Sequence, residues 1–312
     1  MEQTRPGPAF LYLAIAGGIL AVSTAAIFIR YAQQDAPSLV IAAFRLTLAS
    51  AILAPIAWFR HRDELRALTR RALGLGLLSG FFLALHFAAW ISSLEFTTVA
   101  SSVVLVTTTP LWVAIFSPLF LRETPTRATM VGLSLALVGG TIVGLSEACA
   151  WDGALSCPPL SEFTRGSAFL GNFLALVGAW MAAGYLMIGR KLREEMSLVP
   201  YISVVYGIAA IFLLIIMAGA GQSPFGYPPL TYLWLLLLAL IPQLLGHSTL
   251  NWALRYVPAS LVAVMLLGEP IGSTILALLV LAETPSALEI GGGLIILTGI
   301  YIASRVETKN HN

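Results

Sequence analysis

Two stretches of this chain repeat each other at a constant distance of 160 residues along the sequence. Residues 94–139 align without a gap to residues 254–299, and 12 of the 46 aligned pairs are identical. Several identities are residues with special backbone properties, which chance similarity between apolar sequences does not explain. We therefore interpret the chain as an internal duplication. The most distinctive pairs are Glu123-Thr124-Pro125 with Glu283-Thr284-Pro285, Pro110 with Pro270, Gly132 with Gly292, and Gly139 with Gly299.

Composition indicates that the duplicated unit lies in a membrane. Hydrophobic residues make up 58% of the 312-residue chain and charged residues 10%, with a mean hydropathy of +0.88, whereas soluble proteins have about 25% charged residues. Residues 196–254 carry no formal charge, and a spanning helix needs roughly 20 residues, so this stretch must hold two helices. We predict an all-α integral membrane fold with ten transmembrane helices, at 9–29, 38–58, 73–93, 97–117, 128–146, 168–188, 198–218, 230–251, 256–279 and 287–304.

The positions of Lys and Arg predict the orientation, because cytoplasmic loops are enriched in both residues. With a cytoplasmic N-terminus, 14 of the 17 basic residues fall on the cytoplasmic side, five of them between residues 60 and 71. The first span is too long for the apolar region of a secretory signal, so we treat it as a helix. We expect a multi-pass protein of the inner (plasma) membrane with both termini in the cytoplasm.

Ten spans in two copies give five spans per copy, and this odd number makes the second copy cross the membrane in the opposite direction. The charges agree, because the basic segment 60–71 aligns with 220–231, which has no basic residue. We predict an N-terminal repeat at 9–146, an external loop at 147–167 and a C-terminal repeat at 168–304. Inverted-topology repeats are a recurring plan of secondary transporters, whose site lies near the midplane between the repeats.

The sequence resembles the EamA-type group of the drug/metabolite transporter superfamily over roughly residues 10–305. The resemblance implies transport of small metabolites, amino acids among them, through a central cavity lined mainly by the first, third, fourth, sixth, eighth and ninth spans. It also implies that the fifth and tenth spans are packing elements. The matching features are Arg45, Ser93-Leu94-Glu95-Phe96 and Ala253-Leu254-Arg255-Tyr256 at the starts of the fourth and ninth spans, Pro110 and Pro270, and Glu123 and Glu283 at helix ends.

Glu269 is the clearest ionisable residue inside a predicted span, and such residues are functional candidates by default. Pro270, and Pro110 in the other repeat, lack an amide hydrogen, so both helices are expected to break there and to free a carbonyl. A carboxyl beside such a break can bind a cation or exchange a proton, which makes Glu269 the candidate coupling residue. The alternative is a protonated Glu269 that only hydrogen-bonds a neighbouring helix. The repeat partner of Glu269 is Thr109, whose hydroxyl can satisfy a freed carbonyl.

Gln243, His247 and Asn251 recur at four-residue steps in the eighth span, which places them on one face of an α-helix. Polar groups facing lipid would lack partners, so we expect this stripe to line the cavity and to bind substrate. His247 is also the candidate proton partner of Glu269, because imidazole exchanges protons near neutral pH. The alternative is a polar seam that holds helices together.

His86 and Trp90 lie one turn apart in the third span and form a second predicted wall of the substrate site. Trp180 and Tyr185 in the sixth span are expected to add aromatic surface. A mixed aromatic and polar wall suits an amino acid or an amine. The alternative for each aromatic residue is packing between helices or a place at the membrane interface.

Arg45 lies about two turns inside the outer end of the second span, within reach of the outer interface. We expect it to pair with backbone carbonyls or with Glu95 near the outer surface. Contact with a carboxylate of the substrate is the alternative.

Cys149 and Cys157, the two cysteines of the chain, lie eight residues apart in the predicted external loop, a spacing that permits a disulfide. The loop offers too few ligands for a metal site, and we expect neither a metal nor a cofactor. Gly291-Gly292-Gly293 lie within a span and lack the ending of a nucleotide loop. Anionic cytoplasmic lipid explains the basic segment 60–71, so we expect no nucleic-acid partner.

The leading functional hypothesis is a secondary active carrier. It would export an amino acid or a similar amphipathic metabolite by alternating access, with protons as the coupling ion. One alternative is an uncoupled facilitator of the same substrates. Another is a membrane-embedded enzyme that uses His86, His247 and Glu269 on a lipid, which the repeat disfavours because catalysis has no need of two opposed halves.

Overall fold

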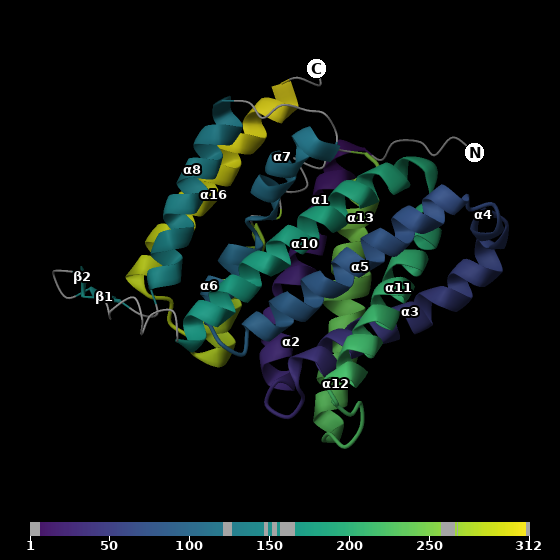
Figure 1. Ribbon diagram of the computed structural model, residues 1–312, viewed down its shortest axis with the longest axis horizontal. Coiled ribbons are helices and arrows are strands. Elements are labelled where there is room, and N and C mark those ends of the chain that lie inside the picture. Colours follow the sequence, from purple (N-terminus) through teal and green to yellow (C-terminus); the bar gives the residue numbers. More distant parts are fainter. Residues whose placement is uncertain are drawn as a thin grey trace.

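The computed structural model describes residues 7–120, 127–146, 149–151, 155–156, 166–256, 266 and 268–309. In these ranges the regular secondary structure is helical apart from one two-stranded antiparallel sheet (Figure 1). The first repeat contains α1 (Pro8–Ser23), α2 (Ala25–Ala32), α3 (Ser38–Arg60), α4 (Arg62–Arg66), α5 (Arg70–Ser93), α6 (Val99–Val106), α7 (Thr109–Phe120) and α8 (Arg127–Leu145). Strands β1 (Ala150–Trp151) and β2 (Leu155–Ser156) follow. The second repeat contains α10 (Ser167–Glu195), α11 (Leu198–Gly219), α12 (Pro229–Leu238), the π-helix η1 (Ala239–His247), α13 (Ser248–Ala253), α15 (Gly268–Leu276), the π-helix η2 (Ala277–Leu281) and α16 (Ala287–Lys309).

Ten apolar helical segments match the ten predicted spans. Within the described residues, six are long and apolar enough to cross a membrane, and one of these joins α12, η1 and α13. Large apolar side chains such as Phe59 (83% exposed) and Leu279 (74% exposed) lie on the outside of the bundle, where lipid solvates them. The prediction of an all-α integral membrane fold is confirmed. The four shorter apolar segments are Val99–Val113, Met130–Val143, Gly268–Leu281 and Ala287–Gly299.

The second helices of the two repeats, α3 and α11, pack together and run in opposite directions. Just before α3, the carboxylate of Asp35 accepts a hydrogen bond of 2.6 Å from the hydroxyl of Thr231 in α12. Just after α3, the carboxylate of Glu64 accepts bonds of 2.7 and 2.6 Å from the backbone N–H and the hydroxyl of Ser197, the residue before α11. Because α11 begins where α3 ends, the second repeat is inverted relative to the first.

The ends of the bundle agree with this inversion. In Figure 1, α1 begins and α16 ends at the upper end of the molecule, where α4 also lies. The turn between α11 and α12 lies at the opposite end. The basic segment that contains α4 is therefore separated from its repeat counterpart by the full length of the helices.

The fifth helices of the repeats, α8 and α16, lie side by side at one edge of the molecule (Figure 1). A Cβ atom added at Gly139 would come within 2.6 Å of the carbonyl oxygen of Gly292, and one added at Gly299 within 2.6 Å of the carbonyl oxygen of Gly132. These four glycines form two of the identical pairs found in the repeat, so each contact is the repeat-related copy of the other. Glycine is needed here because the two backbones touch.

The remaining helices surround a central region and contact one another in repeat-related pairs. The contact of α5 with α10 is matched by that of α1 with η1, and the contact of α5 with α11 is matched by that of α3 with η1. Helix α6 contacts both α10 and α15. Helix α6 of the fourth span and α15 of the ninth span thus meet between the two repeats.

Candidate functional site

A cavity with a volume of about 90 Å³ lies between the two repeats. This exceeds the roughly 10–15 Å³ that one water molecule requires, so a small solute fits. Helices α5, α6 and α7 of the first repeat and α10, η1, α13 and α15 of the second repeat supply its walls. The cavity therefore lies at the repeat interface, where inverted-repeat transporters bind their substrates.

Both repeats present a helix start to this cavity. Helix α6 ends at Val106 and α7 begins at Thr109, while α15 begins at Gly268, so Pro110 and Pro270 each lie in the first turn of a helix. A first turn tolerates proline because its amide hydrogens have no partner within the helix. The hydroxyl of Thr109 donates 2.8 Å to the carbonyl of Val106, four residues before Pro110. The carbonyl group that Pro110 leaves without an amide partner is therefore hydrogen-bonded within the protein.

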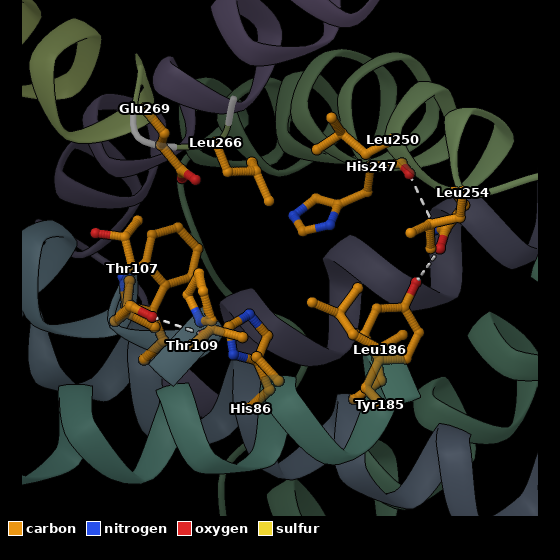
Figure 2. Close-up of a pocket in the computed structure, with 16 residues that line it drawn as sticks. His86, Thr107, Thr109, Tyr185, Leu186, His247, Leu250, Leu254, Leu266 and Glu269 are labelled. Carbon is orange, nitrogen blue, oxygen red and sulfur yellow. Dashed lines mark hydrogen bonds between the residues drawn. The ribbon is translucent and has the colours of Figure 1, made fainter. Parts of the chain in front are cut away.

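Glu269 points into the cavity from the first turn of α15 (Figure 2). His247 enters from the same side, and His86 and Tyr185 enter from the opposite side. Within the part of the chain that the structure describes, no hydrogen bond joins Glu269 to His247. The two groups share one cavity, and a proton that passed between them would cross it through solvent or substrate.

Helix α5 contributes His86 and Trp90 to the wall, as the one-turn spacing predicts. Nδ1 of His86 lies 2.9 Å from the carbonyl oxygen of Gly178 in α10 and donates to it. In a neutral imidazole Nε2 is then the acceptor. The His86 and Trp90 rings stack with centroids 6.0 Å apart, which fixes both side chains against α5.

Asn251 is held by a network of hydrogen bonds at the other end of the cavity. Its Oδ1 accepts a bond of 2.8 Å from the hydroxyl of Tyr185, and both residues line the cavity. Its Nδ2 donates 2.9 Å to the carbonyl of His247 and 3.2 Å to the hydroxyl of Tyr206. The amide is therefore oriented before any ligand arrives, which favours selective binding.

Gln243 departs from the predicted stripe. It is fully buried but does not line the cavity, although His247 and Asn251 do. The segment Ala239–His247 is a π-helix with Pro242 inside it, so its side-chain directions differ from those of a regular α-helix. The oxygen of Gln243 instead accepts a bond of 2.8 Å from Nε of Arg45.

The expected pairing of Arg45 near the outer surface is wrong. Its guanidinium is fully buried and lies 4.1 Å from the centre of the Phe87 ring. Glu95 instead accepts a hydrogen bond of 3.1 Å from the backbone N–H of Ser38. Helix α3 packs against α5, α11 and η1, and Arg45 lies on the face turned towards them, so it cannot extend to the membrane interface.

Comparison with known protein families identifies the family of this chain. The EamA-like transporter family matches this chain twice, at residues 9–145 and at residues 169–305. The chain belongs to that family. This EamA-like protein is therefore a transporter and a multi-pass integral membrane protein, and the hypothesis of a membrane-embedded enzyme is excluded.

Curated relatives of this EamA-like transporter have similar lengths. It is 25% identical to an uncharacterized transporter of Archaeoglobus fulgidus, covering 89% of this chain and 91% of the relative. It is 25% identical to the pseudopaline exporter CntI of Pseudomonas aeruginosa (89% and 90%) and 22% identical to the uncharacterized transporter YetK of Bacillus subtilis (93% and 86%). A solved crystal structure with a TM-score of 0.65 and 17% identity covers 98% of this chain and all of its own, which shows the fold.

Trp180 of the transporter does not line the cavity, against expectation. Its ring meets Trp112 edge-to-face with centroids 5.1 Å apart, and it meets Phe173 at 6.3 Å. Trp180 lies on a different face of α10 from Ala182 and Tyr185, which do line the cavity. Its role in the structure is packing, the alternative that the sequence left open.

The loop between the repeats is described only in part. Cys149 is disulfide-bonded, and its predicted partner Cys157 lies outside the described residues. The antiparallel pairing of β1 and β2 places Ala150 opposite Ser156, the residues adjacent to the two cysteines. Among the described residues, no group of three or more His, Cys, Asp or Glu side chains could hold a metal ion.

Apolar residues that sequence reasoning did not single out also line the cavity. Leu250 and Leu254 follow His247 at helical spacing, and Leu186 follows Tyr185. The spacing was visible in the sequence, but a leucine facing a cavity has the same pattern as a leucine facing another helix. Thr107 and Thr109 also line the cavity, on the first-repeat side.

Proposed function

We propose that this transporter exports amino acids or similar amphipathic metabolites by alternating access, coupled to protons. The observation that carries the proposal is a cavity between two inverted repeats in which Glu269, the one carboxyl group among the described lining residues, lies in the first turn of α15. Broken helices at a repeat interface supply binding groups for solutes and coupling ions in secondary transporters. The membrane in this proposal is the inner (plasma) membrane, with both termini and the basic segment 60–71 in the cytoplasm.

The cavity walls suit an amphipathic solute. Imidazole, indole, phenol and amide groups from His86, Trp90, Tyr185 and Asn251 surround it, and leucines supply apolar surface. Such a lining offers both hydrogen bonds and apolar contact, as small-molecule sites generally do. An amino acid with an apolar or aromatic side chain satisfies both kinds of surface.

Alternating access requires that one end of the cavity is closed while the other opens. At the end opposite α4, which is the outer end in this proposal, Glu289 of α16 accepts hydrogen bonds from the hydroxyls of Thr98 and Ser101 (2.8 Å for Ser101). Glu283 accepts a bond of 3.0 Å from the backbone N–H of Val99. These bonds join the first turn of α6 to the second repeat, so they support closure of the outer end.

Export is the direction we favour. The Pseudomonas aeruginosa relative is named as an exporter, and it covers almost the same length as this chain. The relative's substrate does not transfer at 25% identity, because the side chains that line a cavity change faster than the fold that holds them.

Proton coupling rests on Glu269. Its carboxyl group faces the cavity, so it can take up and release a proton during transport. In the alternating cycle, protonation at one face of the membrane and release at the other would link the proton gradient to substrate movement. His247 lies in the same cavity and is the candidate partner in that exchange.

The test is transport by purified protein in sealed proteoliposomes. Vesicles are preloaded with radiolabelled amino acids, and efflux is compared with and without an inwardly directed proton gradient, against protein-free vesicles. The proposal expects efflux that the gradient accelerates. Efflux independent of the gradient would identify an uncoupled facilitator, and the absence of efflux for every amino acid would reject this substrate class.

A further inference from the structure

The polar side chains that line the cavity of the transporter spend most of their hydrogen-bond donors inside the protein. The hydroxyls of Thr107 and Thr109 each donate a bond of 2.8 Å to a backbone carbonyl earlier in the chain. Nδ1 of His86 donates to a carbonyl of α10 at 2.9 Å, which leaves Nε2 of the neutral ring as an acceptor. The indole N–H of Trp90 is buried, so a ligand cannot reach it. These lining groups therefore retain lone pairs but offer a ligand no hydrogen.

Tyr185 and Asn251 form a wall of the cavity with the same polarity. The hydroxyl of Tyr185 donates its hydrogen to Oδ1 of Asn251 at 2.8 Å. Both hydrogens of the Asn251 amide are also used, because Nδ2 donates 2.9 Å to the carbonyl of His247 and 3.2 Å to the hydroxyl of Tyr206. A hydroxyl oxygen and an amide oxygen each have two lone pairs, so both oxygens of this wall can still accept a bond. Neither residue can donate one to a ligand without breaking a bond within the protein.

Tyr206 of α11 helps to hold the Asn251 amide in this orientation. Tyr206 is fully buried and does not line the cavity, and its oxygen accepts the second amide hydrogen. The backbone of Asn251 is fixed as well, because its carbonyl accepts a bond of 3.2 Å from Nε of Arg193. If the amide were turned around, its oxygen would face the carbonyl oxygen of His247, and neither acceptor would have a donor. The polarity of the wall is thus set by groups that a substrate does not touch.

We propose that Tyr185 and Asn251 form a subsite for a hydrogen-bond donor, the primary ammonium group of an amphipathic amine, and that Tyr206 is the positioning residue that sets its polarity. An ammonium group carries three N–H donors and no acceptor, so it can bond both oxygens of the wall. The leucines of the lining supply surface for the apolar part of the molecule. A carboxylate carries acceptors alone and finds no complementary group at this wall.

Two other groups bear on the choice between an amine and an acid. Within the described residues no hydrogen bond holds the ring of His247, so its N–H is the lining donor that a carboxylate could use. Arg45 is fully buried and does not line the cavity, so it offers a carboxylate no hydrogen bond. Its positive charge acts against any cation in the cavity. A preference for an amine must therefore come from the N–H groups of the ligand and not from its charge alone.

This inference rests on the proposed function, because it concerns the substrates of that same cavity. Its test uses four probes with one apolar body: isoamylamine, its quaternary analogue trimethylisoamylammonium, isocaproate and L-leucine. The quaternary analogue keeps the positive charge without an N–H group, isocaproate has only acceptors, and leucine is isoamylamine with an added carboxylate. A ligand of the folded protein raises its melting temperature by mass action.

For purified wild-type transporter we expect isoamylamine to act at concentrations roughly tenfold lower than the quaternary analogue or isocaproate, through the two hydrogen bonds that only the amine can donate. Leucine should bind through its ammonium group, and no more tightly than isoamylamine. The difference between isoamylamine and the quaternary analogue separates hydrogen-bond donation from charge.

The variants assign the preference to this wall. Tyr185→Phe removes one acceptor oxygen, so it should weaken isoamylamine about fivefold and leave the quaternary analogue unchanged. Tyr206→Phe leaves an amide hydrogen of Asn251 free to meet an acceptor, so the preference for isoamylamine over isocaproate should fall about fivefold. Tyr232→Phe is the matched control, because its hydroxyl bonds the carbonyl of Pro224 and lies outside the cavity lining. It should keep the preference of wild type.

The outcomes separate the subsite from the proposed function. If the quaternary analogue or isocaproate stabilises wild-type protein as well as isoamylamine does, or if no probe stabilises it, the subsite is wrong. An unchanged preference in Tyr206→Phe overturns the positioning role, and an unchanged affinity for isoamylamine in Tyr185→Phe overturns the assignment to this wall. If isoamylamine binds as expected but no solute moves in proteoliposomes, the proposed function fails and the subsite stands. Amino-acid efflux without a preference for the amine overturns the subsite alone.

Discussion

Arg30 of α2 and Glu283, between η2 and α16, form an ion pair with an N–O distance of 3.0 Å. Arg30 also donates 2.9 Å to the carbonyl of Thr97, and the other carboxylate oxygen of Glu283 accepts the N–H of Val99. The ion pair and its two hydrogen bonds thus join α2, the start of α6 and the loop before α16. They link the two repeats at the end of the bundle opposite α4.

Removing this ion pair should favour opening at that end. In Glu283→Gln, loss of a pair whose side chains are 25% and 28% exposed should cost about 1 kcal/mol. That corresponds to a roughly fivefold increase in the open population. The measurement is the rate at which a membrane-impermeant maleimide labels Ala182→Cys, a cavity position, from outside intact cells.

Glu194→Gln is the matched control for the labelling experiment. It removes one carboxylate from an exposed position near the other end of the bundle, at the end of α10. Labelling at residue 182 should not change in this variant. Equal labelling rates in wild type and Glu283→Gln would show that the Arg30–Glu283 pair does not hold this end of the bundle closed.

The contact between α8 and α16 predicts a strict size limit at Gly139. An added methyl group in Gly139→Ala would meet the carbonyl oxygen of Gly292 at 2.6 Å, so the helices must separate, at a cost of about 1–3 kcal/mol. The neighbouring Gly140→Ala meets only Leu105 at 3.8 Å and should be tolerated. Melting of the detergent-solubilised proteins compares the two, and equal melting temperatures would contradict the close packing.

The fold is well predicted from the sequence because several independent signals agree. Length, charge-free runs and the repeat all pointed to ten spans. The glycines at 132, 139, 292 and 299 served only as evidence for the duplication, and the structure adds that they lie at the contact between α8 and α16. The repeat also carried the inversion, since an odd number of spans per copy leaves no other arrangement. The number of spans and the inversion follow from the spacing of apolar and charged residues along the chain. Neither depends on the direction of an individual side chain.

The site was harder to predict, because it depends on local helix geometry. Gln243 was predicted to line the cavity, but it is buried and bonded to Arg45 of α3, a contact that four-residue spacing cannot reveal. Arg45 was placed near the outer surface because a long side chain can extend outwards, but neighbouring helices enclose it completely. Trp180 was expected at the site because it is aromatic, but it packs against Trp112 instead. Tertiary packing decides each of these cases.

Thr109 should stabilise the helix break beside Pro110. Its hydroxyl bonds the carbonyl of Val106 that the proline leaves without an amide partner, so Thr109→Val should cost about 1 kcal/mol. For a protein of this size, that lowers the melting temperature by roughly 2–4 °C. Thr141→Val is the comparison, because Thr141 is exposed and bonds the Leu137 carbonyl inside an unbroken helix. An equal effect in both variants would argue against a special role for Thr109.

Glu269→Gln in proteoliposomes tests the coupled-carrier proposal most directly. The variant keeps the size and hydrogen-bonding capacity of the side chain but cannot exchange a proton. The measurement compares substrate accumulation driven by a proton gradient with counterflow, in which labelled substrate exchanges for unlabelled substrate without a gradient. We predict that Glu269→Gln loses accumulation and retains counterflow. Undiminished gradient-driven accumulation in this variant would contradict the assignment of Glu269 as the coupling residue.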